Sequence, residues 1–183
     1  MSAALLTSAF LSFAALLMTA WYGVTGASLS RHILFGIFST MLTLLTHSML
    51  MFYLLGKGKA VREAVAEGGL SGDFARRIAE LRSPVFSLAT LAMSLTIVAA
   101  LVGASVDTGR LPASVHGILA AIAIAANLAM LRAEVSALMA SAQVVAEVNR
   151  LLNAGAVLQL HGVQRKEAMM PLDRREPRRD NRN

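Results

Sequence analysis

Cysteine is absent from the 183-residue chain. Its absence excludes disulfide bonds, iron–sulfur clusters, thiolate zinc sites, covalently attached c-type haem and a cysteine nucleophile. Histidine occurs four times and tryptophan once. Any metal or cofactor chemistry therefore depends on very few side chains.

Charged residues are also few. Only 15% of the residues are Asp, Glu, Lys or Arg, against about 25% in a typical soluble domain. Hydrophobic residues make up 56%, and the charged residues are segregated along the chain. These features predict an integral membrane protein.

Four long windows contain no Asp, Glu, Lys or Arg, and each exceeds the roughly 20 residues that an α-helix needs to cross a bilayer. We therefore predict an all-α membrane protein with four transmembrane helices in an up-and-down bundle. The runs are too long for the strands of a membrane barrel and lack their period-2 alternation. The expected spans are 3–26, 32–56, 84–105 and 112–132.

The distribution of Lys and Arg predicts the orientation, because these residues accumulate on the cytoplasmic side. Six lie in the segment 57–82 and nine follow residue 131, whereas the two opposite connections hold only Arg31 and Arg110. We expect both termini in the cytoplasm (N-in/C-in). Richness in Ala and Arg, together with helical spans, favours a multi-pass protein of the bacterial inner (cytoplasmic) membrane.

A helical hairpin is predicted over 57–82, between the second and third spans. Its composition favours helices, with Gly68 and Gly69 ending the first helix and Ser71 capping the second. Both arms would project into the cytoplasm.

The fourth span is expected to continue as a helix over 133–155. An apolar stripe on this extension needs a partner, which is the hairpin, the membrane interface or another subunit; Glu134 is placed off the stripe. The stripe consists of Val135, Leu138, Met139, Ala142, Val145 and Leu152.

The chain is thus divided into a bundle with its extensions, 1–162, and a charged tail, 163–183. The composition of the tail predicts disorder, and its arginines would attract anionic lipid headgroups. Aromatic residues are not interleaved with the basic ones, so we expect no nucleic-acid binding.

His47 lies inside the second span, roughly 15 Å along the helix from Lys57 at 1.5 Å per residue. A neutral imidazole there needs a partner, and polar side chains commonly connect membrane helices. We expect an interhelical hydrogen bond, and the candidate partners are Asn127, Thr90, Ser94 and Thr46.

The functional alternative makes His47 an axial haem ligand or a quinone contact. Met93 in the third span has the same expected depth, so the geometry allows His47 and Met93 to be the two axial ligands of one haem iron. The chain has 10 methionines, however, and methionine often fills packing gaps. We expect no resident cofactor, with haem b as the alternative.

His32 and His116 both lie near the outer ends of parallel spans, the second and the fourth. A bis-histidine haem or a metal ion could bridge them; the alternative is that both are hydrated interfacial residues. Because no further ligand repeats at helical spacing, and two imidazoles alone make a poor zinc site, we predict no metal site.

Small residues form a ridge on the fourth span at strict four-residue intervals: Gly117, Ala121, Ala125 and Ala129. Such spacing lets membrane helices approach closely. The ridge predicts a helix contact, either with another span of the same chain or with another subunit.

The sequence contains no Ser-His-acid constellation and no paired carboxylates, so we expect no enzyme. The leading prediction is a structural or accessory subunit of a larger integral membrane assembly, such as an electron-transfer complex or a homo-oligomer. Its partners would be other membrane subunits, a second copy of the chain, and lipids.

Two alternatives come from other functional classes. One is a small haem- or quinone-binding redox protein that uses His47, or His32 with His116. The other is a channel or transporter component that forms a pore only on oligomerisation, lined by hydroxyl residues such as Thr40, Thr43, Ser87 and Ser94.

Overall fold

The computed structural model describes residues 2–168, and the regular structure in this range is entirely helical. The predicted all-α class with four long helices is confirmed. The helices are α1 (Ser2–Thr25), α2 (Leu29–Glu67), α3 (Phe74–Asp107) and α4 (Ala113–Ala168).

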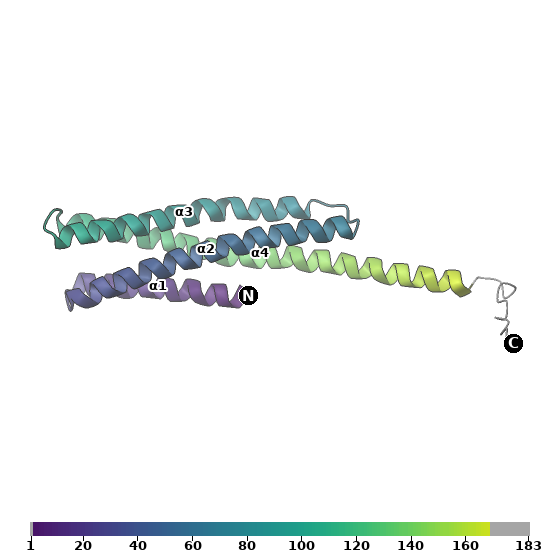
Figure 1. Cartoon of the computed structure of the whole chain (residues 1–183), viewed down its shortest axis with the longest axis horizontal. Coiled ribbons are helices and arrows are strands. Elements are labelled where there is room, and N and C mark those ends of the chain that lie inside the picture. The colour runs from purple at the N-terminus through teal and green to yellow at the C-terminus, as the bar shows by residue number, and fades with distance from the viewer. Residues whose placement is uncertain (1, 169–183) are drawn as a thin grey trace, which may run out of the picture.

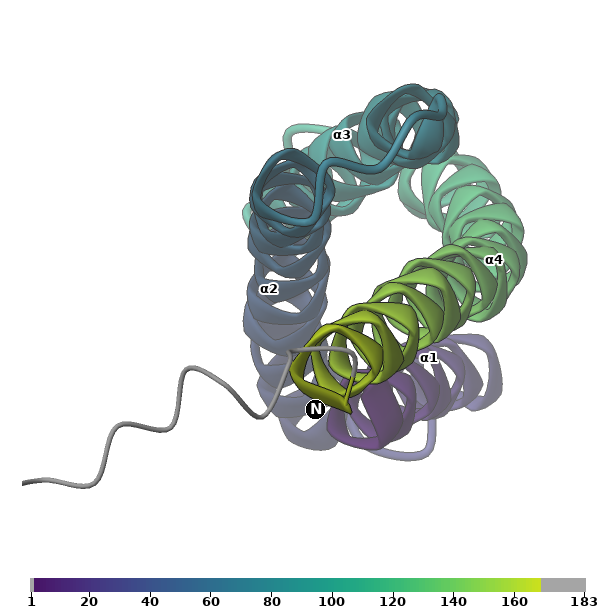
Figure 2. The same cartoon turned by 90° about the vertical axis from the view of Figure 1, so that its right-hand side faces the viewer.

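The four helices run antiparallel in chain order and, viewed end-on, follow one another around a ring (Figures 1 and 2). Each helix packs on its neighbours in the ring, and α2 also contacts α4 across it. The loops 26–28 and 108–112 lie together at what we call the short-loop end. The opposite end, which carries the α2–α3 turn at 68–73, is the turn end.

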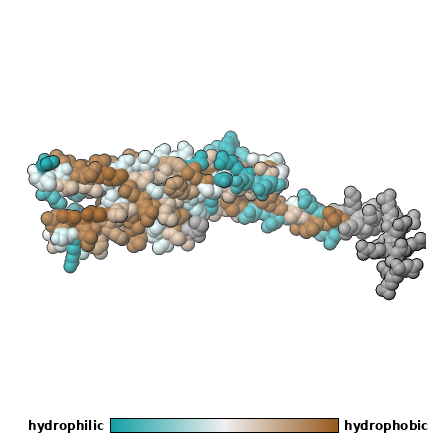
Figure 3. Space-filling model, in the orientation of Figure 1, coloured by the Kyte–Doolittle hydropathy of each residue, from teal (hydrophilic) through white to brown (hydrophobic). Residues whose placement is uncertain are grey.

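All four helices are long and apolar enough to cross a membrane, as expected of a multi-pass membrane protein. The 24 residues of α1 extend about 36 Å at 1.5 Å per residue, close to the thickness of a bilayer core. The 56 residues of α4 extend about 84 Å on the same rise. Hydrophobic surface covers much of the bundle towards the short-loop end, and hydrophilic surface gathers near the turn end (Figure 3).

Local sequence explains where the helices begin and end. The side chain of Ser28 caps α2 by accepting a hydrogen bond from the backbone of Arg31, and Gly68 is the C-cap. Gly69 follows with a positive φ of 59°, a conformation that glycine adopts without strain. The predicted cap at Ser71 is wrong: α3 begins later, and its N-cap position is Asp73.

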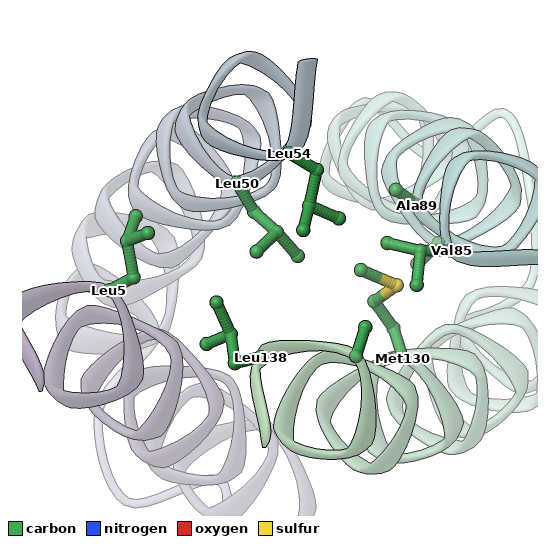
Figure 4. Close-up of a cluster of buried hydrophobic side chains, with 9 residues drawn as sticks. Leu5, Leu50, Leu54, Val85, Ala89, Met130 and Leu138 are labelled. Atoms are coloured by element: carbon green, nitrogen blue, oxygen red, sulfur yellow. The ribbon is translucent and has the colours of Figure 1, made fainter. Parts of the chain in front are cut away.

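One hydrophobic cluster fills the bundle where all four helices meet (Figure 4). Leucines from α1, α2 and α4 meet Val85 and Ala89 of α3 and Met130 of α4. Small residues on α3 let α4 approach, so leucine and methionine side chains can fill the space between them. The leucines are Leu5, Leu50, Leu54 and Leu138.

A second cluster lies nearer the turn end and joins the predicted hairpin to α4. Val61 of α2 packs with Phe74 and Ile78 of α3 and with Val144 and Val148 of α4. Outside this cluster, Arg77 of α3 and Glu147 of α4 form an ion pair, with 2.7 Å between Nη1 of Arg77 and Oε2 of Glu147. The first part of the α4 extension therefore has its partner within the chain.

The predicted apolar stripe on the extension requires correction. Met139 is exposed and Ala142 is also on the outside, whereas Glu134 is fully buried. The face of α4 that packs on α2 and α3 is the buried one, and it includes small and polar residues that hydropathy alone assigns to the surface. The residues of this buried face are Glu134, Ala137, Leu138, Ser141, Val144 and Val148.

Beyond Leu152, α4 leaves the bundle and continues alone to Ala168 (Figure 1). It remains helical past residue 162, where the sequence analysis placed the start of the tail; the rest of that tail, 169–183, lies outside the described residues.

We expect Ile78→Ala to destabilise the packing at the turn end by about 2–5 kcal/mol, because it leaves a cavity in a buried cluster. Hydrogen–deuterium exchange of the detergent-solubilised protein should accelerate in the segments 58–66 and 74–82. Arg62→Ala, a change at an exposed position of α2, is the control. Unchanged exchange in Ile78→Ala would contradict the docking of the hairpin on α4.

Candidate functional site

A buried polar cluster connects three helices within the bundle. Nε2 of His47 on α2 lies 3.1 Å from Oδ1 of Asn127 on α4. Nδ2 of Asn127 donates to Oγ1 of Thr96 on α3 at 3.0 Å and to the Ala123 carbonyl at 2.8 Å. Thr96 donates in turn to the Ala92 carbonyl at 2.7 Å. Among the partners considered from the sequence, His47 pairs with Asn127.

These contacts determine the hydrogen position on His47. The oxygen of Asn127 can only accept, so Nε2 of His47 carries the hydrogen and Nδ1 keeps its lone pair. The Asn127 amide is oriented by its nitrogen, which faces two acceptors. Metal ligation through Nε2 of His47 would therefore require this hydrogen bond to break, and Nδ1 is buried with no partner among the described residues.

Met93, the second ligand considered for His47, belongs to a separate contact. The hydroxyl of Ser48 lies 4.0 Å from its sulfur, a weak hydrogen bond between α2 and α3. His47 and Met93 thus have different polar partners, and this geometry does not favour a shared iron.

Small polar residues follow one side of α2 at helical spacing. Ser39, Thr43 and Thr46 are buried, as is His47. Ser39 lies 3.2 Å from the hydroxyl of Thr19 on α1, whereas Thr43 and Thr46 have no hydrogen-bond partner among the described residues. This polar side of α2 escaped the sequence analysis, although the spacing of these residues could have revealed it.

His32 and His116 meet at the short-loop end. Their ring centres are 5.8 Å apart, and the planes are inclined at 75°. Nδ1 of His32 donates to the Thr19 carbonyl of α1 at 2.9 Å, and Nδ1 of His116 donates to the Ala99 carbonyl of α3 at 3.1 Å. The structure therefore brings together two residues that lie far apart in the chain.

A glycine lies against each of these rings. A Cβ added at Gly23 would lie 2.8 Å from Cε1 of His32, and one added at Gly103 would lie 3.0 Å from Cε1 of His116. A larger residue at either glycine would displace the ring, so both positions shape the pair.

Glu134 is the ionisable residue that sequence reasoning misplaced. Its exposed fraction is 0%, and both carboxyl oxygens lack a hydrogen-bond partner among the described residues. It follows Met130 and precedes Leu138, both members of the hydrophobic cluster where the four helices meet. An unpaired carboxylate is costly in such surroundings, so the neutral acid is the form that this site accommodates.

The small-residue ridge on α4 lies on the outside of the bundle. Gly117, Ala121, Ala125 and Ala129 are all exposed, and a Cβ added at Gly117 would meet nothing within 4 Å. The ridge therefore faces away from the other described spans.

We expect Asn127→Leu to destabilise the bundle by about 1–3 kcal/mol, because it removes the partner of a buried imidazole. Thermal unfolding in detergent is the measurement. The loss of unfolding free energy in the double variant Asn127→Leu/Thr96→Val should be smaller than the sum of the losses in the two single variants. Thr90→Val, at an exposed position of α3, is the control. Strict additivity would show that the Asn127–Thr96 bond contributes nothing.

Glu134→Leu should leave the thermal midpoint unchanged or raise it, because the substitution removes a buried polar group that has no hydrogen-bond partner among the described residues. Glu134→Gln should resemble the native protein. A fall of several degrees in both variants would show that the carboxyl group has a partner that the described contacts omit.

Comparison with protein-family models, with curated proteins and with solved structures finds no match.

Proposed function

We propose that this protein is a non-catalytic structural subunit of a larger integral membrane assembly, in which α4 provides the contact surfaces. The observation that carries the proposal is that α4 presents two unpartnered faces. One is the small-residue ridge at membrane level, and the other is the part of the helix beyond the bundle.

The ridge supports a contact within the membrane. Association between helices in lipid depends on close packing, because lipid tails are as apolar as leucine, and small residues four positions apart permit that packing. Since the ridge faces away from the other spans, its partner is a helix outside this bundle. Ala121 and Ala125 lie at its centre, flanked by the exposed Ile118 and Ile122.

The free part of α4 supports a contact outside the bilayer. Val157, Leu160 and Val163 share one side of the helix and are 50%, 65% and 56% exposed. A single helix of this length is marginal in water unless it packs against something. We infer that another subunit covers this face.

The distribution of Lys and Arg supports an orientation with the turn end and both termini in the cytoplasm. We retain the bacterial inner membrane as the proposed location, and anionic lipids as contacts for the basic residues near the turn end. Among these residues, Lys57 is held against α4 by a 3.3 Å hydrogen bond to Ser141.

A pore-forming role has less support. Of the hydroxyl residues considered, Thr43 is buried inside the bundle, whereas Ser87 and Ser94 lie on the outside of α3. The hydroxyl groups of Thr40 and Ser87 bond to carbonyls one turn back on their own helices. These residues do not share one face that could line a lumen.

We expect Ala125→Leu to reduce the association constant between this chain and its partner at least tenfold, because a larger side chain separates helices that meet at the ridge. Analytical ultracentrifugation after mild-detergent extraction from the native host measures the mass of the assembly. Ala100→Leu makes the same change at an exposed position of α3 and should leave the mass unchanged. A native protein that sediments as a single chain would contradict the proposal.

A further inference from the structure

The two hairpins of the bundle, α1–α2 and α3–α4, surround the His32–His116 pair in the same way. In each, the histidine lies near the start of the second helix and bonds to a carbonyl of the first, 13 residues earlier for His32 and 17 for His116. Each ring also lies against a glycine of that first helix, Gly23 or Gly103. The pair therefore lies where two similarly built halves meet.

The hydrogen bonds leave one nitrogen of each ring available. A carbonyl oxygen can only accept, so Nδ1 of each histidine carries the hydrogen, and Nε2 of the neutral ring holds a lone pair. Metal-binding histidines are typically held in this way, with the second nitrogen bonded to a backbone carbonyl. His47 has the opposite arrangement, because its Nε2 donates to Asn127.

The spacing of the rings matches a single metal atom held between them. Two metal–nitrogen bonds of about 2.0–2.1 Å, added to about 1.15 Å from each nitrogen to its ring centre, separate the ring centres by about 6.4 Å when the two ligands are in line. The observed separation is 5.8 Å, about half an ångström shorter, so binding would move the rings slightly apart.

The number of protein ligands identifies the class of metal centre. No group of three or more His, Asp or Glu suited to a metal ion occurs among the described residues, so a free ion would gain only these two imidazoles. Zinc sites need three or four protein ligands. Haem iron already has four porphyrin nitrogens and needs only two axial ligands. In a chain without cysteine, the haem would be the non-covalent b type.

We propose that His32 and His116 are the axial ligands of a b-type haem at the short-loop end of the bundle. The two glycines beside the rings, Gly23 and Gly103, limit crowding around the pair. This inference goes beyond the structural role of α4, and either can fail without the other.

The test is the absorption spectrum of the full chain, expressed with added haem precursor and purified in mild detergent. We expect a Soret band, a sharp α-band on reduction and one haem per chain by the pyridine haemochrome assay. His32→Ala and His116→Ala should each reduce bound haem at least tenfold. Two control variants should retain the native spectrum. His161→Ala changes a histidine beyond the bundle, and Met93→Leu changes the residue considered as a haem ligand together with His47.

Two further variants keep the test decisive if the alanine variants fold poorly. His116→Gly should lose the low-spin spectrum and recover it when free imidazole is added. Gly103→Ala should alter the α-band, because its Cβ would push the ring of His116. A native protein that shows no Soret band after hemin titration, or a full spectrum retained in both alanine variants, overturns the proposal.

Discussion

The structure depends on one constraint: polar groups inside this bundle have no water to bind, so they must find partners within the protein, on their own helix or on a neighbouring one. Burial of apolar surface gives little preference for one helix contact over another in lipid, which leaves packing and hydrogen bonds to select the arrangement. Asn127 meets this need for α2 and α3 at once, through His47 and Thr96. Its position determines the register of three helices.

The same constraint explains the short-loop end. One nitrogen of each ring, on His32 and His116, is bonded to a carbonyl of the neighbouring helix, and a glycine makes room for each ring. Glu134 and Thr43 have no hydrogen-bond partner among the described residues, so the contacts of residues 2–168 do not explain why these two polar groups are buried.

The sequence was sufficient for the number and class of helices, because an uncharged window of about 20 residues has few structural alternatives. The sequence did not show which side of each helix is buried. Hydropathy predicts Glu134 on the outside because it is charged and Met139 on the inside because it is apolar, whereas the approach of α4 to α2 and α3 buries Glu134 and exposes Met139. The sequence predicts only that His32 and His116 lie near the outer ends of parallel spans and leaves a bridged pair and two interfacial residues as alternatives, because their contact and their bonds to Thr19 and Ala99 depend on how the helices rotate.

The central claim is that α4 is covered by another subunit in its native setting. The chain has no cysteine, so single cysteines report accessibility without background. Maleimide labelling at Val157→Cys and Leu160→Cys should be slow in native membranes and fast in the purified single chain. Gly155→Cys, on the opposite side of the helix and exposed, should label quickly in both. Equal, fast labelling of all three in native membranes would contradict the claim.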